Sequence, residues 1–274
     1  MTKQHEGRTD FYSVQYTRFD SELAAELRRE VFGEDIGQQG WRTAAEQAEI
    51  ADLLRVGQAS HVLDICCGSG GPSLALVERI GCRLTGVDIE DAGIAQAQSQ
   101  ASARGLADRA RFAVRDCGRA LPYEGGSFDA VLCIDAIIHL RDRFGTLREW
   151  ARLLREGGRL VFADLAVITC PVTKSELDIR TATGFFLFVP PGVNEEAIRD
   201  AGLILVRSED RTAAVAELAD RWHAARVRHA AALEREEGTE AFERRQRYYA
   251  TSAELARNRR LSRFLYVAEK PTQS

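Results

Sequence analysis

The chain lacks the features that define several large classes of protein. In its 274 residues no apolar run approaches the roughly 18 that a helix needs to cross a bilayer, which argues against a membrane-spanning protein. The opening segment, MTKQHEGRTD, has no apolar core of the kind that a signal peptide carries, so we expect a cytoplasmic protein. The formal net charge is −4, so positive charge is not in excess. We expect neither nucleic acid nor membrane among its partners.

Cysteine is present, but not in a metal-binding or redox pattern. The chain has six cysteines, and the adjacent pair Cys66 and Cys67 cannot form a C-x-x-C motif. Scattered cysteines in a protein without a secretion signal are normally reduced thiols. No cluster of acidic residues in the sequence indicates a divalent cation either, so we expect no metal.

The most informative segment runs from His61 to Asp88. Residues 61–66 are rich in bulky apolar side chains, as in a strand that is buried on both faces. Residues 66–71, CCGSGG, are small enough for a tight turn and for a close approach of the backbone to a ligand. A helix over 72–80 follows, opened by a proline, and then a strand that ends at Asp88. An acid in that position holds the ribose hydroxyls of a nucleotide in doubly wound folds.

The loop itself distinguishes between two kinds of ligand. A dinucleotide fold has G-x-G-x-x-G, whose third glycine lets the helix pack closely while its amino terminus meets a pyrophosphate. Ser73 stands in the place of that third glycine here. Asp64 directly precedes the loop and would repel a pyrophosphate, whereas a cationic or hydroxyl-bearing ligand suits it better. A nicotinamide oxidoreductase is therefore disfavoured.

The rest of the chain alternates predicted strands and helices. Strands are expected over 61–66, 82–87, 110–115, 128–134, 159–164 and 203–207, and helices over 72–80, 91–104, 143–154 and 196–201. Such alternation predicts an α/β fold with a Rossmann-like doubly wound sheet and helices on both faces. The chain then divides into an N-terminal helical cap (1–56), a Rossmann-like core (57–208), a helical insert (209–260) and a last core strand with a tail (261–274).

The helical insert has two apolar stripes of helical period. One includes Val215, Leu218 and Trp222, and the other includes Phe242 and Tyr249. Helices of this kind do not fold alone, so the stripes must cover something. One interpretation is packing on the sheet edge or contact with a second subunit in a homodimer. The other is a lid over a substrate pocket.

An acid followed by a glycine-rich loop resembles the first motif of class I S-adenosylmethionine-dependent methyltransferases. The resemblance covers most of residues 60–165, and Cys66 replaces the first glycine of the motif. It implies S-adenosylmethionine (SAM) as cofactor, S-adenosylhomocysteine (SAH) as product, and an antiparallel last strand. It also implies a cofactor site made of Asp64, Cys66, Gly68 and Gly70 around the methionine portion, Asp88 and Ile89 at the ribose, Asp116 and Cys117 at the adenine, Ile134 at the methyl group, and Gln39 and Trp41 closing over the cofactor. The other interpretation of Asp116 is a turn residue before glycine.

Residues 128–140, FDAVLCIDAIIHL, predict a buried strand that runs into the loop where reacting groups meet in open α/β sheets. The segment contains neither the N-P-P-Y or D-P-P-Y of enzymes that methylate base amino groups nor a Pro-Cys nucleophile, which argues against DNA methylation. Methyl transfer is an in-line displacement, and many acceptors must lose a proton, which a histidine can accept. His139 is either that base or a wall residue, and the sequence does not decide between the two.

A narrower resemblance is to small-molecule methyltransferases of the phosphoethanolamine, sarcosine/dimethylglycine, tocopherol and isoprenoid type. It rests on residues 32–35 with Gly40, on residues 135–140, and on the helical insert before the last strand. In phosphoethanolamine enzymes an amino-terminal tyrosine pairs with the histidine of that segment and closes the site. The resemblance implies this role for Tyr16, with Tyr12 as the rival.

Together these observations predict a SAM-dependent methyltransferase with a small-molecule substrate. The first expectation is N-methylation of an amine or phosphobase. The alternative is C- or O-methylation of an isoprenoid, quinone or other natural product, with the apolar run 185–188 as a pocket wall rather than plain core. A second alternative is a protein that binds SAM or SAH without turnover.

Overall fold

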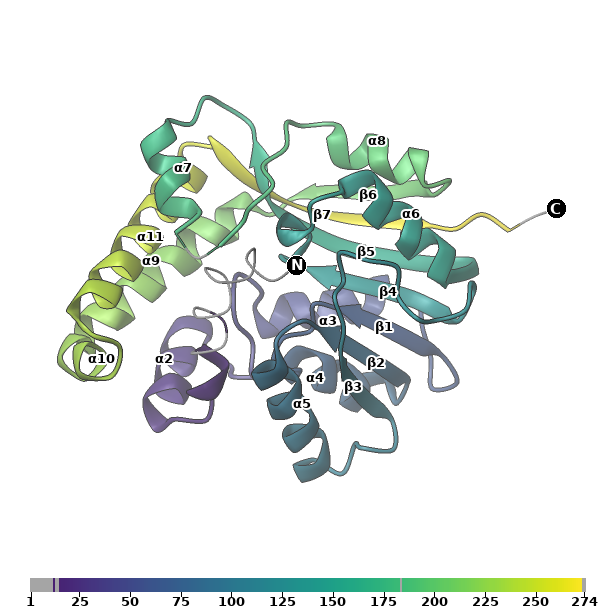
Figure 1. Cartoon of the computed structure of the whole chain (residues 1–274), viewed down its shortest axis with the longest axis horizontal. Coiled ribbons are helices and arrows are strands. Elements are labelled where there is room, and N and C mark those ends of the chain that lie inside the picture. The colour runs from purple at the N-terminus through teal and green to yellow at the C-terminus, as the bar shows by residue number, and fades with distance from the viewer. Residues whose placement is uncertain (1–11, 13–14, 183, 273–274) are drawn as a thin grey trace, which may run out of the picture.

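The computed structural model describes residue 12, residues 15–182 and residues 184–272. Seven strands in the described residues form one sheet with the order β3-β2-β1-β4-β5-β7-β6 (Figure 1). The strands are β1 (His61–Ile65), β2 (Arg83–Asp88), β3 (Ala110–Val114), β4 (Phe128–Ile134), β5 (Leu154–Ile168), β6 (Ile204–Asp210) and β7 (Leu261–Glu269).

The sheet is mostly parallel. Strands β1 to β5 pair in parallel, and β7 is antiparallel to both β5 and β6. The Rossmann-like fold and the antiparallel last strand predicted from the sequence are therefore confirmed. In this arrangement the carboxyl ends of β1, β2 and β4 lie at the same edge of the sheet, so the segments that follow them come together there.

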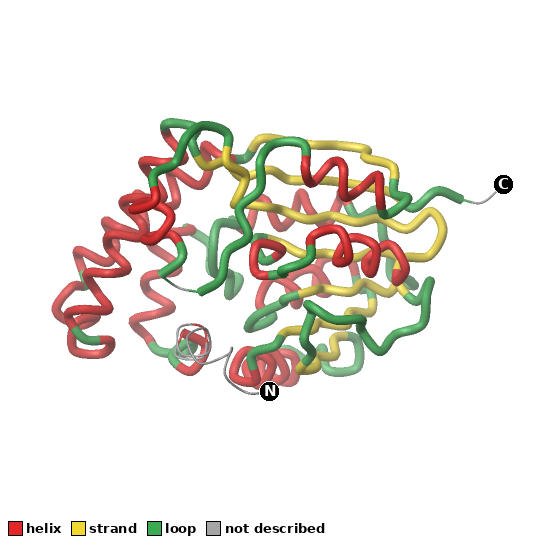
Figure 2. The backbone as a smooth tube through the Cα atoms, turned by 45° about the horizontal axis from the view of Figure 1, so that its top comes forward, coloured by secondary structure: helices red, strands yellow, loops and turns green. Residues whose placement is uncertain are grey.

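Helices cover both faces of the sheet (Figure 2). On one face α3 (Ala44–Leu53), α4 (Gly71–Ile80) and α5 (Asp91–Ala103) share a core that includes Leu74 and Ala97. On the other face α6 (Arg143–Leu153) and α8 (Val193–Asp200) share a core that includes Trp150. Both cores are continuous with the buried side chains of the strands, which fixes the sheet as a rigid support.

A third core lies beyond the carboxyl edge of the sheet. It joins the helices α2 (Glu22–Phe32), α9 (Thr212–Arg228), α10 (Ala230–Glu237) and α11 (Thr239–Arg257). These helices form the left side of the molecule in Figure 1. The apolar stripes of the insert thus pack against the amino-terminal cap and against Trp41, Ile138, Leu165 and Phe186. None of the described helices has the length and apolar character that a membrane crossing requires.

Two elements differ from the sequence prediction. Helix α7 (Lys174–Arg180) was not expected, because it is short and has no apolar period; its first turn is fixed by a capping box between Thr173 and Glu176. Strand β5 is longer than the predicted 159–164, because its carboxyl half continues to pair with the beginning of β7. Between them, these elements carry the chain over the carboxyl edge of the sheet.

Candidate active site

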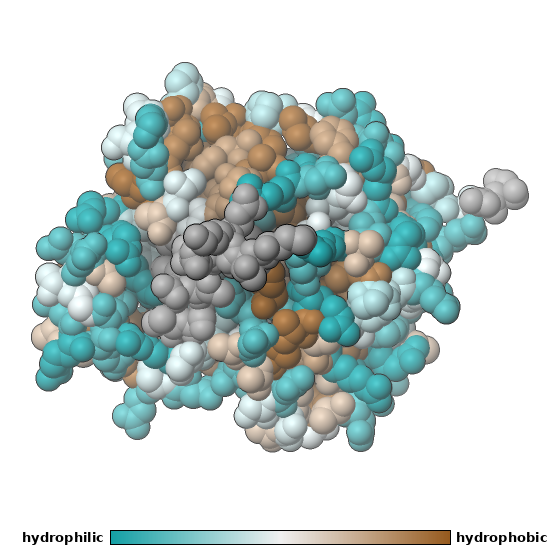
Figure 3. Space-filling model, in the orientation of Figure 1, coloured by the Kyte–Doolittle hydropathy of each residue, from teal (hydrophilic) through white to brown (hydrophobic). Residues whose placement is uncertain are grey.

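A cavity opens where the carboxyl edge of the sheet faces the cap and the insert. Its lining includes residues of the glycine loop and the end of β2 (Cys66, Cys67, Gly68, Ser69, Asp88, Ile89, Glu90), of the end of β4 and the segment after it (Ile134, Asp135, Ala136, Ile138, His139), of the loop after α7 (Phe186), and of the cap and insert (Tyr12, Tyr16, Gln39, Trp41, Arg42, Trp222, Arg244, Arg245, Tyr248, Tyr249). In Figure 3 the outer surface near α10 is mostly hydrophilic, and hydrophobic residues gather on the face between α7 and α8. The insert therefore turns its apolar side toward the interior.

The glycine loop takes the conformation that its small residues allow. Gly68 and Gly70 have φ angles of 57° and 75°, in the left-handed region. A Cβ at Gly70 would lie 2.6 Å from the Cβ of Ala97, so no larger residue fits without movement. Cys66, which replaces the first glycine of the motif, has a φ of 57° and also lies in the left-handed region. The loop keeps its shape despite this replacement, at the cost of a strained residue.

Asp88 braces this loop from the end of β2. The Gly68 N–H donates to Asp88 Oδ2 at 2.8 Å, and the Glu90 N–H donates to Oδ1 at 3.0 Å. The carboxylate is buried and lines the cavity together with Ile89. Asp88 is therefore fixed in the position that the sequence predicted for the ribose, while contact with a ribose stays a prediction.

Asp64 supports the loop from behind rather than lining the cavity. Its Oδ2 accepts a hydrogen bond from Ser73 Oγ at 2.5 Å, so the serine in the place of the third motif glycine has a structural partner. Burial raises the pKa of the Asp64 carboxyl to about 6, against the opposing effect of the nearby Arg42 guanidinium. Neither Asp64 nor Gly70 is among the residues that line the cavity. They shape the part of the loop that is expected to hold the methionine portion, without forming its surface.

The residues expected at the adenine lie at the margin of the site. Asp116 accepts the Gly118 N–H at 2.9 Å and pairs with Arg119 at 3.2 Å. This is the turn geometry that the sequence left open as the other interpretation. Cys117 is buried beneath it. Neither residue is among those that line the cavity, and their contact with adenine stays a prediction.

His139 lies at the end of the short 3-10 helix η1 (Ile137–His139), after β4. Its Nδ1 is 2.9 Å from the carbonyl oxygen of Phe185, and its Nε2 is 3.0 Å from the hydroxyl of Tyr12. Because a carbonyl oxygen can only accept, Nδ1 carries the proton. In the neutral ring Nε2 is then the acceptor, and it lies on the side of the ring where Tyr12 lines the cavity.

The tyrosine that pairs with His139 is Tyr12 and not Tyr16, so the pairing implied for Tyr16 is wrong. The two tyrosines are stacked, with ring centroids 6.4 Å apart. Tyr16 lies deeper and covers the glycine loop: a Cβ at Gly68 would be 2.7 Å from its hydroxyl. Burial and the charge of Asp88 raise the pKa of Tyr16 above its usual value. Tyr16 thus belongs to the cofactor side of the cavity.

A buried ionic group that the sequence analysis missed forms the wall beside Ile134. Arg263 of β7 donates through Nε to Asp135 Oδ1 at 2.7 Å and through Nη1 to Glu46 at 2.7 Å. Asp135 has a φ of 59°, and its buried Oδ2 has no hydrogen-bond partner in the described part of the chain. Arg42 lies in the same wall, where burial lowers its pKa while the charges of Asp64 and Asp135 oppose that effect. No local pattern could have revealed this group, because its members come from three separate segments, the start of α3, the end of β4 and β7.

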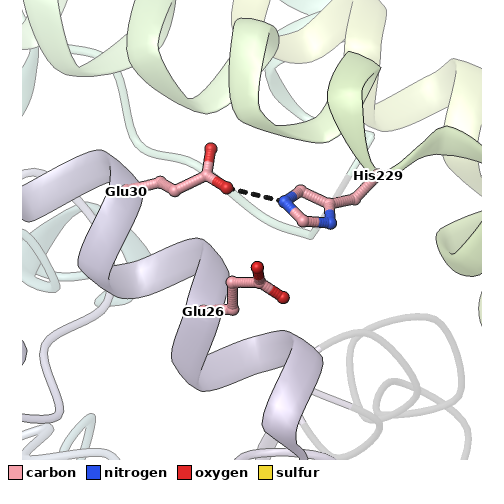
Figure 4. A group of neighbouring side chains, drawn as sticks. All are labelled: Glu26, Glu30 and His229. Atoms are coloured by element: carbon pink, nitrogen blue, oxygen red, sulfur yellow. Dashed lines mark hydrogen bonds and ion pairs between the residues drawn. The ribbon is translucent and has the colours of Figure 1, made fainter.

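One group among the described residues has the ligand atoms for a metal ion. Glu26 and Glu30 of α2 lie near His229, which follows α9 (Figure 4). Glu30 already accepts hydrogen bonds from His229 and Arg228, and these lower its pKa. The group is largely exposed and outside the cavity lining, so it joins the cap to the insert rather than taking part in the site.

Comparison with known proteins agrees with this geometry. Residues 62–158 match the model of a family described as a methyltransferase domain. Methyltransferase GfsG of Streptomyces halstedii is 36% identical over 119 residues, which are 43% of this chain and 42% of that protein. The 27-O-demethylrifamycin SV methyltransferase of Amycolatopsis mediterranei is 27% identical over 198 residues, 68% of this chain and 72% of that protein. The match to GfsG thus covers less than half of either chain.

A solved structure supports the fold over nearly the whole chain. Phosphoethanolamine N-methyltransferase 2 of Haemonchus contortus, in complex with phosphomonomethylethanolamine and SAH, has a TM-score of 0.79 at 18% identity. The similarity covers 96% of this chain and 60% of that one. At this identity the likeness shows the fold alone, a mostly parallel Rossmann-like sheet with an antiparallel last strand.

Proposed function

We propose that this chain, whose residues 62–158 belong to the methyltransferase domain family, is a SAM-dependent enzyme that methylates a hydroxyl oxygen of a small molecule. The observation that carries the proposal is the orientation of His139. Its Nδ1 proton is held by the Phe185 carbonyl, which leaves Nε2 as a proton acceptor at the cavity wall.

The cofactor side of the cavity fits the group that this fold family uses. A loop without bulky side chains, an acid at the end of β2 and a tyrosine over the loop leave room for a nucleoside with a methionine tail. When bound, SAM supplies a methyl group on a positively charged sulfur. Gly68 and Cys66 would face its methionine portion, and Asp88 its ribose.

The residues of this chain then act on the acceptor. His139 Nε2 takes the proton of the acceptor hydroxyl in exchange for its hydrogen bond with Tyr12. With SAM bound, its methyl group would pass from sulfur to this oxygen as the carbon–sulfur bond breaks, SAH would be the product, and His139 would hold the proton. Aromatic side chains of the cap and insert exclude water, so the charges of this step are not screened.

The charge of the acceptor side favours a hydroxyl over the amine expected first. The lining residues from 182 to 249 include Arg244 and Arg245 and no acid. Each guanidinium has a carboxylate partner outside the lining, Glu240 for Arg244 and Glu237 for Arg245, so these lining residues offer an ammonium acceptor no acid of their own to pair with. The aromatic rings of Phe186, Trp222 and Tyr249 suit a ring or another apolar body. The rifamycin relative is named for a 27-O-demethyl substrate, which supports the same acceptor atom.

The test is methyl transfer from SAM that carries a labelled methyl group. The protein is incubated with a panel of phenols, aliphatic alcohols, amines and isoprenoids, and products are identified by mass spectrometry. Label on oxygen is the expected result. Label on nitrogen or carbon would overturn the acceptor assignment and keep the enzyme class. No label, together with no binding of SAH in calorimetry, would overturn the proposed function itself.

A further inference from the structure

Buried arginines in this protein have carboxylate partners, with one exception. Six arginine side chains among the described residues are buried. Five of them form ion pairs, as Arg143 does with Asp164 at 2.8 Å and Arg263 with Asp135 at 2.7 Å. The sixth is Arg180, the last residue of α7, which is 1% exposed and has no ion pair with any described residue. A buried charge without a counter-charge is costly, so its presence calls for a reason.

The side chains around Arg180 pack against its guanidinium group but do not neutralise its charge. Its guanidinium carbon lies 4.5 Å from the ring centroid of Tyr248, 5.7 Å from Phe186 and 6.0 Å from Trp41. Its Nη1 donates to Ser252 Oγ at 2.5 Å, a neutral acceptor. Its Nε is buried and has no hydrogen-bond partner among the residues that the structure describes. Aromatic rings thus surround the group while one edge of the guanidinium still needs an acceptor.

Arg180 is not itself part of the cavity surface but lies directly behind the rings of its acceptor side. Trp41, Phe186 and Tyr248, the three rings around it, all line that cavity, as does Ala182 two residues further along the chain. Phe186 also contacts His139, with ring centroids 5.0 Å apart. One phenyl ring therefore separates the guanidinium from the imidazole that is proposed to act as base.

We propose that Arg180 is the anion-binding residue of the acceptor pocket, and that the acceptor carries a carboxylate or phosphate group that docks on its Nε edge. Arginine presents a planar fork that matches both groups, with Nε as one prong. The side-chain rotations needed to admit the ligand between the surrounding rings are common on binding. This inference rests on the proposed function, because it takes the cavity to hold a methyl acceptor, and it narrows that acceptor to an acidic hydroxyl compound.

Binding to the SAH complex tests the proposal with three matched probes. The wild-type protein, saturated with SAH, is titrated with 4-hydroxybenzoate, 4-hydroxyphenyl phosphate and methyl 4-hydroxybenzoate. The acid or the phosphate should bind at least roughly tenfold more tightly than the neutral ester, since a charge-assisted contact is lost in the ester. Which of the two anions binds better distinguishes a carboxylate site from a phosphate site. Equal affinity for all three probes would overturn the proposal.

Variants then test whether Arg180 causes the tighter binding of the anionic probes. Arg180→Gln should lose the preference for the anion, and Arg180→Lys should keep part of it because the charge remains without the fork. Arg247→Gln is the matched control: it removes the same charge from exposed α11 surface, where Arg247 pairs with Glu243, and should keep the preference. An anion preference that survives in Arg180→Gln would overturn the assignment. Binding of SAH itself should not change in any variant, which separates this test from that of the proposed function.

Stability gives a second readout that needs no acceptor. If Arg180 serves to bind a ligand, its buried charge has no counter-charge in the ligand-free protein. Arg180→Met should therefore leave the thermal unfolding midpoint unchanged or raise it. Arg143→Met leaves the buried Asp164 without its ion-pair partner and should lower the midpoint by roughly 5 °C or more. An equally large drop in Arg180→Met, with the anion preference intact in Arg180→Lys and Arg180→Gln, would assign Arg180 to the fold instead.

Discussion

The two sides of the cavity are built in different ways. The cofactor side comes from short segments that directly follow β1 and β2, and its polar contacts, such as Gly68 to Asp88, join residues near each other in the chain. The acceptor side comes from the cap, the loop after α7 and the insert, and its contacts join distant segments. The Tyr12 and His139 bond spans 127 positions, for example.

The chemistry of the two sides differs as well. The cofactor side offers backbone N–H groups, small residues and carboxylates, which suit a ligand with hydroxyls and a positive sulfur. The acceptor side offers aromatic rings and guanidinium groups. The fold thus determines what the cofactor side binds. The acceptor side can bind a different ligand when its side chains change and the backbone stays the same.

The largest expected effect is on the acceptor side. His139→Ala should lower kcat by a factor of about 10² to 10⁴, because a general base is lost. Binding of SAH should be unchanged, because the cofactor side is untouched. Turnover with the hydroxyl acceptor found by methyl labelling measures the effect. His223→Ala, on α9 and outside the cavity lining, is the control. Turnover that survives in His139→Ala would make His139 a wall residue.

The next effect belongs to the cofactor side. Asp88→Ala removes the acceptor of two backbone N–H groups and the proposed partner of the ribose. The dissociation constant of SAH should rise by roughly 10- to 100-fold, the cost of a lost charged hydrogen bond. Isothermal titration calorimetry gives the constant directly. Asp116→Ala, at the exposed turn, should have a much smaller effect. A similar loss in both variants would place Asp116 at the adenine after all.

Asp64 couples the cofactor side to pH. Its pKa in the folded protein is about 6, above the value near 3.9 of an unfolded chain, so the folded state holds the proton more tightly. The free energy of unfolding should therefore fall by about 3 kcal/mol in all as the pH rises from about 4 to about 6, and stay level above that. Denaturant titrations of the wild type and of Asp64→Asn across this range measure the difference. A constant difference between the two proteins at every pH would contradict the burial of the charge.

The smallest effect separates the two tyrosines. Tyr12→Phe removes the hydroxyl that contacts His139 Nε2 and should lower kcat/KM by about fivefold, near 1 kcal/mol. Tyr16→Phe should change the affinity for SAH more than the turnover, because its hydroxyl lies over Gly68. Steady-state kinetics and calorimetry on both variants give the pattern. The reverse pattern would return Tyr16 to the role that the sequence resemblance implied.

What the sequence predicted follows the same division. The strands of the core, the glycine loop and Asp88 are local patterns, and each was found near its observed place. The partner of His139 was assigned to the wrong tyrosine, because a choice between residues 12 and 16 depends on how the cap docks. The wall made by Arg263, Asp135 and Glu46 was missed, because no spacing rule connects a strand after the insert with a helix before the core.

The position of β7 has a consequence for how the protein is made. This strand follows the insert in the sequence, yet it lies between β5 and β6 in the sheet. On the ribosome, β5 can pair with β4 before β7 exists, but its other edge stays open, and β6 cannot join the sheet until residues 261–269 have been synthesised. Arg263 arrives with that strand and completes the wall of the cavity. Until then, a nascent chain has open strand edges at β5 and β6 and no complete pocket. The same nine residues therefore cover the edges that could aggregate during synthesis and complete the pocket on which activity depends.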